Sequence, residues 1–116
     1  MEESILTSIK KMLGISSEDE SFDVDIIIHI NSVFMILRQM GVGPLIDDFT
    51  ITDNADKWSD YLEDKTDLES VKTYVYLKVK MIFDPPINSS IIEAYNKLIN
   101  ELEWRLNNQV DYDYDE

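Results

Sequence analysis

The chain has 116 residues and a net charge of −14, because 24 acidic side chains face only 10 basic ones, and it contains no cysteine. This length predicts one domain with a modest hydrophobic core. The lack of cysteine excludes disulfide bonds, zinc sites built from thiolates and thiol catalysis. Proteins that bind nucleic acids neutralise phosphates with Lys and Arg, so the acidic balance argues against direct DNA or RNA binding.

The N-terminal segment predicts a short helix followed by a polar, acidic hinge. Ser4 is placed to cap the first turn, and Gly14 is placed to end the helix. Between them, Leu6, Ile9 and Leu13 recur at helical spacing and form an apolar stripe.

A longer helix is predicted over residues 22–40, with Ser21 as its N-cap and Gly41 as its stop. Its core-facing stripe is expected to comprise Phe22, Ile26, Ile30, Val33, Leu37 and Met40. Further apolar residues lie on its other faces. A helix that is apolar nearly all round is either central in its bundle or shared with a neighbouring subunit. In so small a domain we favour a shared surface for part of it.

Residues 41–52 predict an irregular loop that is too apolar for free solvent, and loops of this length often carry function. A short helix over residues 55–64 should follow, capped by Asp53 or Asn54.

A capping box from Thr66 to Glu69 then predicts a long helix through Phe83. It should stop at Asp84, because the following Pro85 and Pro86 lack N–H donors and restrict the residue before them.

The last helix is predicted from about Ser90, with Glu93 completing a capping box, through Leu106. Its inward stripe should comprise Ile91, Tyr95, Leu98, Leu102 and Leu106. Long helices joined by a short turn pack as an antiparallel hairpin. The fold class is therefore all-α: a small helical bundle of about four to five helices, with a long irregular loop after the second long helix. Residues 1–108 form the helical domain, and residues 109–116 form an extended acidic and tyrosine-rich tail.

Nothing in the sequence points to catalysis, a cofactor or a metal. His29, the single histidine, lies in an apolar helix with no nucleophile placed to use it. Asp111, Asp113 and Asp115 resemble the start of a calcium loop but lack its glycine and its closing glutamate. We therefore expect no enzyme activity.

No targeting or membrane segment is expected. The apolar runs, such as Ile26–Ile28 and Val33–Leu37, are far short of a bilayer span, and the first residues lack the basic and apolar regions of a secretory signal. What remains is more apolar surface than one thin helical domain can hide, which marks contact sites for other proteins.

The ordered elements resemble the head–tail connector proteins of long-tailed bacteriophages. The resemblance runs through IKKMLGISSEDESFDVDIIIHINSVF, GVGP, WSDYLED, LESVKTYVYLKVKMIFDPP and LINELEWRLN, and covers about residues 5–108. It implies a structural virion protein of the neck, at the head–tail interface, made in the host cytoplasm. Such adaptors form a ring, of twelve copies in the virion, beneath the portal protein. The ring extends the DNA channel and docks a stopper or tail-completion protein, and DNA passes through it without specific binding.

In that family the C-terminal segment grips the portal. Carried onto this sequence, the portal-binding residues would be Trp104, Val110, Asp111, Tyr112, Asp113 and Tyr114. In an extended chain the apolar and acidic residues of this tail would alternate between two sides.

Contacts between ring subunits are expected from the apolar loop, the aromatic helix after it and the outer face of the second helix. These candidates are Ile28, Phe34, Ile36, Val42, Leu45, Ile46, Phe49, Trp58 and Tyr61. Carboxylates that line a channel repel the DNA backbone and let it slide. The channel-lining candidates are Glu18, Asp19, Glu20, Asp47, Asp48 and Asp53.

An alternative function is an acidic inhibitor that mimics the charge of DNA and occupies a nucleic-acid-binding protein. Such an inhibitor needs carboxylates spaced regularly over one exposed face. Here they gather at helix starts and in the tail, which favours the connector.

Overall fold

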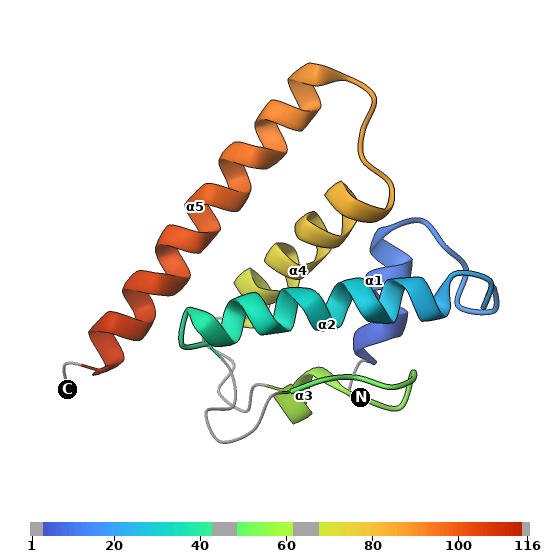
Figure 1. Cartoon of the computed structure of the whole chain (residues 1–116), viewed down its shortest axis with the longest axis horizontal. Helices are drawn as coiled ribbons and strands as arrows, with labels where there is room; N and C mark the ends of the chain where they lie inside the picture. The colour runs from blue at the N-terminus through green and yellow to red at the C-terminus, as the bar shows by residue number, and fades with distance from the viewer. Residues whose placement is uncertain (1–3, 43–48, 62–67, 115–116) are drawn as a thin grey trace.

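The computed structural model describes residues 4–42, 49–61 and 68–114, and in the last of these ranges it describes the side chains from Glu69 to Asn107. The described residues contain five helices (Figure 1). They are α1 (Ile5–Met12), α2 (Asp23–Gln39), α3 (Trp58–Tyr61), α4 (Leu68–Phe83) and α5 (Ser89–Tyr114). These residues contain no strand, only an isolated bridge between Ser4 and Lys57. The predicted all-α class is confirmed.

Helix α1 begins and ends as predicted. The Ser4 hydroxyl accepts a hydrogen bond from the backbone N–H of Thr7 at 3.2 Å. Gly14 has a φ of 82°, in the left-handed region that favours glycine, and reverses the chain after the helix. Ile5, Leu6 and Ile9 are buried.

Helix α2 starts one residue later than predicted, and Ser21 is not its cap. Phe22 occupies the N-cap position and makes no side-chain capping bond. The backbone N–H of Ser21 instead donates to the Asp19 carboxylate at 3.0 Å. Phe22 is also not a core residue: it is 44% exposed and packs edge-on against Phe83.

The central helix of the fold is α4, not α2. It contacts α1, α2 and α5, and its buried residues Val71, Tyr74, Val75, Leu77 and Val79 lie on more than one face. The β-branched and aromatic residues of this segment are accommodated because neighbouring helices pack around it. Helix α2 buries Ile26, Ile30, Val33 and Leu37 as predicted and keeps an outer face.

Asn31 of α2 forms two hydrogen bonds with the segment that follows this helix. Asn31 donates from Nδ2 to the Ile51 carbonyl at 3.0 Å, and its Oδ1 accepts from the Ile51 N–H at 2.7 Å. Ile51 is buried as a result.

Neither Asp53 nor Asn54 caps α3: Asp53 accepts from the N–H of Ala55. The carboxylate of Asp60 accepts instead from the N–H of Lys57, directly before the helix. Thr66, from the predicted capping box, lies outside the described residues.

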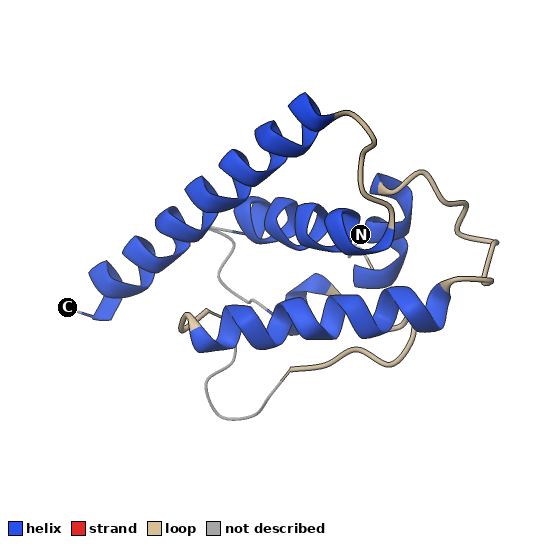
Figure 2. Ribbon diagram, turned by 45° about the horizontal axis from the view of Figure 1, so that its top comes forward, coloured by secondary structure: helices blue, strands red, loops and turns tan. Residues whose placement is uncertain are grey.

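Helices α4 and α5 form the predicted antiparallel hairpin and cross at an angle (Figures 1 and 2). The cap of α5 is Asn88, whose Oδ1 accepts from the N–H of Ser90 at 2.8 Å; the proposed Ser90–Glu93 box is wrong. Ile99, Leu102 and Leu106 are buried.

The first turns of α5 do not follow the predicted inward stripe. Ile91 and Leu98 are 43% and 40% exposed, because the two helices diverge toward the start of α5.

The predicted extended tail is wrong for residues 109–114, because α5 continues through Tyr114. No Gly or Pro follows Pro86, and each residue added to an existing helix gains one hydrogen bond for one residue fixed. The backbone therefore has no local reason to leave the helix at residue 108.

Candidate interaction surfaces

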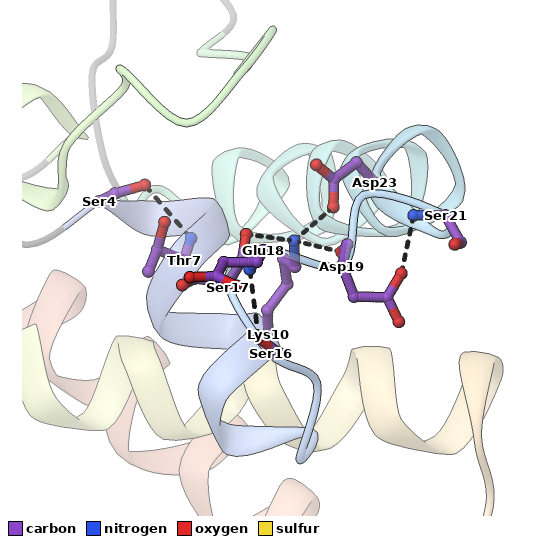
Figure 3. Close-up of polar contacts among 9 residues, drawn as sticks. All are labelled: Ser4, Thr7, Lys10, Ser16, Ser17, Glu18, Asp19, Ser21 and Asp23. Atoms are coloured by element: carbon purple, nitrogen blue, oxygen red, sulfur yellow. Dashed lines mark hydrogen bonds and ion pairs between the residues drawn. The ribbon is translucent and has the colours of Figure 1, made fainter.

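A buried lysine fixes the acidic connection between α1 and α2 (Figure 3). Lys10 is only 2% exposed. Its ammonium donates to the carbonyls of Ser17 at 3.3 Å and Asp19 at 2.7 Å, and it lies 2.7 Å from the Asp23 carboxylate. These acceptors satisfy all three of its donors, and the ion pair provides the partner of the buried Asp23 oxygen.

This role of Lys10 was not predicted, because a lysine at the C-terminal end of α1 is equally well explained by its favourable interaction with the helix dipole. The available signal was its position next to Ile9 on the buried side of an amphipathic helix, with Asp19 and Asp23 following closely. A lysine in such a place needs a partner.

Three of the channel-lining candidates project from the connection that Lys10 fixes. Glu18, Asp19 and Glu20 are exposed. The pKa of Asp19 is lowered, first by hydrogen bonding from the side chain of Ser21, then by the Ser21 backbone and by the charge of Lys10. Asp53 is also exposed, in the turn before α3. Asp47 and Asp48 lie outside the described residues.

Four of the predicted subunit-contact residues are core residues of the same chain. Phe34, Val42, Trp58 and Tyr61 are each less than a tenth exposed. Phe34 stacks on Tyr61 with ring centroids 4.5 Å apart and meets Trp58 edge-on at 6.2 Å. The Trp58 indole N–H donates to the Ser8 hydroxyl at 2.8 Å.

Their burial has a simple cause. The segment after α2 folds back over that helix, so its aromatic residues cover α2 instead of a neighbouring subunit. Phe49 is half-buried in the same cluster, edge-on to Phe34 at 5.3 Å. Leu45 and Ile46 lie outside the described residues.

The outer face of α2 remains available. Val24, Ile28 and Met35 are 71%, 55% and 60% exposed, and they fall along one line of the helix because they are spaced by four and seven residues. We call these three residues the α2 stripe. Ile36 is half-buried beside it.

A small pocket opens at the C-terminal end of the α2 stripe. Its free volume is about 20 Å³, enough for one methyl-sized group. It is lined by Asn31, Phe34, Met35, Arg38, Phe49 and Thr50.

Helix α5 carries a second exposed surface. Trp104 is 68% exposed, on the side away from the buried Leu102 and Leu106. The helix is fixed to α4 by the hydroxyl of Tyr74, which donates to the Glu103 carboxylate at 2.8 Å. The remaining portal-binding candidates, Val110 to Tyr114, continue the same helix.

Three of the described tyrosines, Tyr61, Tyr74 and Tyr76, resist ionisation, and the pKa of Tyr76 is raised first by burial and then by Tyr95. Burial raises the pKa of Tyr61, and burial together with the Glu103 carboxylate raises the pKa of Tyr74, from the ordinary value of 10.0. A raised folded-state pKa means that the folded state favours the neutral phenol. Its contribution to stability is complete below pH 10 and is lost as pH rises through the folded-state values.

We therefore expect alkaline unfolding in which these tyrosines ionise together with the loss of helix. Tyrosinate absorbance and far-ultraviolet circular dichroism, recorded in one pH titration, check this. Ionisation of all six tyrosines near pH 10 with unchanged helix content would contradict it.

In residues 4–42, 49–61 and 68–114, no group of three or more His, Asp or Glu side chains could hold a metal ion. His29 lies beside Phe83, with ring centroids 6.4 Å apart. No helix of the described part is long and apolar enough to cross a membrane. Fold and surfaces together define a small, acidic, all-helical protein that presents apolar side chains for contact.

A protein-family model described as "Phage connector protein" matches residues 5–113. Since the match covers nearly the whole chain, the protein belongs to this phage connector family. The membership confirms the resemblance and implies a structural role in head–tail connection, in the virion, in contact with other head or tail proteins. It agrees with the prediction of a protein that is not an enzyme. Neither the curated proteins nor the solved structures gave a match.

Proposed function

We propose that this protein is an adaptor subunit that forms a ring beneath the portal, extends the DNA channel and docks the next connector, stopper or tail protein. The observation that carries the proposal is the family match over residues 5–113. The absence of a metal-binding group in the described residues and the exposed apolar side chains of α2 and α5 agree with a structural protein.

Helix α5 is the proposed portal-binding arm. It is 26 residues long, and within residues 89–107, where its side chains are described, the buried ones lie between Ile99 and Leu106. Trp104 faces solvent in this section, and the helix continues for eight residues beyond Leu106. A helix anchored in its middle can insert its outer face and its last turns into a groove of a partner, in the manner of other helix-in-groove contacts.

Removal of residues 110–116 should abolish the stoichiometric complex with portal and leave the fold intact, because the variant keeps Ile99, Leu102 and Leu106, which pack α5 on the body. Co-elution of purified subunit and portal in size-exclusion chromatography measures the complex, and circular dichroism checks the fold. An undiminished complex would contradict the assignment of this segment.

Two variants of unchanged length separate the physical contributions of the segment. Replacement of Tyr112 and Tyr114 by Ser removes contact area, and replacement of Asp111 and Asp113 by Asn removes charge. We expect the tyrosine variant to lose binding at every salt concentration. The aspartate variant should lose mainly the salt-sensitive part of the affinity, because exposed charges are screened by salt.

We propose that neighbouring subunits of the ring contact one another through the α2 stripe and Ile36. Ile28 of the stripe and Ile36 are among the residues predicted from the sequence for this contact. The charge of −14 per chain opposes self-association. We therefore propose that the ring of twelve assembles on the portal and does not persist free in solution.

The acidic residues Glu18, Asp19, Glu20 and Asp53, with Asp47 and Asp48, are proposed to face the channel. The exposure of Glu18, Asp19, Glu20 and Asp53 and the fixed position of the first three support this. A structure of the assembled neck tests it directly. A channel lined by Lys11, Lys72 and Lys78 would overturn the proposal.

A further inference from the structure

Helix α5 is the long helix that contributes least to the core. In the described residues, the large side chains that are completely buried all belong to α1, α2, α4 and Ile51. Helices α1, α2 and α4 each contact the other two, whereas α5 packs mainly on α4. We call α1, α2 and α4 the three-helix unit. Its core is built largely without α5.

The connection between α4 and α5 leaves each helix with its own end contacts. Asp84 ends α4 with a backbone hydrogen bond and an ion pair, both to Lys80. Asn88 caps α5. Between them, Pro85-Pro86 has no N–H to donate, and the side chain of Ile87 is 101% exposed. Rotation of the backbone within residues 85–87 therefore breaks no end contact of either helix.

Polar contacts hold α5 on α4 in addition to its few apolar ones. The hydroxyl of Tyr74, a completely buried residue of α4, donates to the carboxylate of the half-buried Glu103 at 2.8 Å. Tyr76 of α4 also hydrogen-bonds with Tyr95 of α5. Removal of the Glu103 carboxylate would leave the Tyr74 hydroxyl buried without its acceptor, which costs free energy. The Tyr74–Glu103 contact therefore favours the docked position of α5.

We propose that α5 undocks from α4 as a unit, by rotation within residues 85–87, while the three-helix unit stays folded. Ile91 and Leu98 are already 43% and 40% exposed (Figure 1), so undocking exposes much less apolar surface than unfolding of the whole chain. The inference concerns the free subunit and goes beyond the proposed function. It allows α5 to take a different angle to the body without loss of the core.

Amide hydrogen exchange of the unmodified full-length chain tests the undocking. Residues 99–106 lie far from both ends of α5, so fraying does not dominate their exchange. After correction for intrinsic rates, we expect them to exchange at least about tenfold faster than residues 26–37 of α2, because an opening smaller than global unfolding suffices. Equal protection of the two segments would overturn the proposal.

Glu103→Ala tests the contact that holds α5 docked. We expect exchange of residues 99–106 to rise about tenfold, the effect of a lost hydrogen bond to a charged group. The matched control is Glu101→Ala, which removes an exposed carboxylate paired with Arg105 of the same helix. It should change this exchange by no more than about twofold. Equal effects of the two variants would show that the Tyr74–Glu103 contact does not hold α5 docked.

Ile26→Val distinguishes undocking from global unfolding. Ile26 is completely buried in α2, and its truncation weakens the three-helix unit equally whether α5 is docked or undocked. Exchange of residues 26–37 should therefore rise about fivefold, while that of residues 99–106 stays within about twofold. Lys10→Met, whose partners lie between α1 and the start of α2, should give the same pattern with a larger rise. A parallel rise in both segments would show that α5 opens only when the whole chain unfolds.

Discussion

Replacing Phe34 by alanine should lower the free energy of unfolding by about 3–5 kcal/mol, the usual loss for a large aromatic side chain removed from a core. Phe34 is 2% exposed and lies in contact distance of three aromatic rings, those of Phe49, Trp58 and Tyr61. The truncation leaves a cavity between α2 and α3 that these rigid rings cannot close. Urea unfolding followed by circular dichroism measures the loss.

The matched control is the next residue, Met35→Ala. Met35 is 60% exposed, so its truncation should change the free energy of unfolding by less than about 0.5 kcal/mol. If Phe34→Ala proves as stable as the control and instead fails only to assemble, Phe34 is a subunit-contact residue after all. The pair therefore decides between the core assignment and the original prediction.

Replacing Lys10 by methionine should lower the free energy of unfolding by about 2–3 kcal/mol. The loss is expected because the Asp23 carboxylate and the carbonyls of Ser17 and Asp19 would be left without their donor. Asp23 keeps some contact with water, with 24% of its side chain exposed, so we place the effect below that of a fully buried pair. In a chain of this length the melting temperature should fall by about 10 °C.

Lys11→Met provides the control, because Lys11 is a neighbouring, exposed residue of the same helix. It should unfold within about 2 °C of the unmodified protein. Equal melting temperatures for the two variants would show that the Lys10 contacts contribute nothing net. A fall for both would show that the net charge, and not the ion pair, controls stability.

Much of the fold was predictable from local signals. Ser4 and Gly14 bound α1, the spacing of Ile26, Ile30, Val33 and Leu37 identifies the buried face of α2, and Pro85-Pro86 ends α4. These signals lie in the geometry of single elements, so they need no knowledge of what packs where. The errors at Ser21 and Ser90 arose because several polar residues compete near each helix start, and only the chain path decides which one caps.

The candidate surfaces were less predictable. The sequence shows that the chain has surplus apolar residues, but it does not say which of them another part of the chain will cover. Phe34 and Trp58 were assigned to a subunit contact and are core, whereas Val24 and Met35 were not singled out and are exposed.

The amino-acid sequence by itself determined the all-helical class, the acidic character and the membership of the phage connector family, because periodicity, composition and the order of motifs are properties of the linear chain. Only the tertiary structure decided that α4 is central, that Lys10 is a buried cation and that Ile87 projects alone into solvent. Burial depends on contacts between residues distant in sequence, such as Lys10 with Asp23 or Trp58 with Ser8, and these contacts have no signature in local spacing.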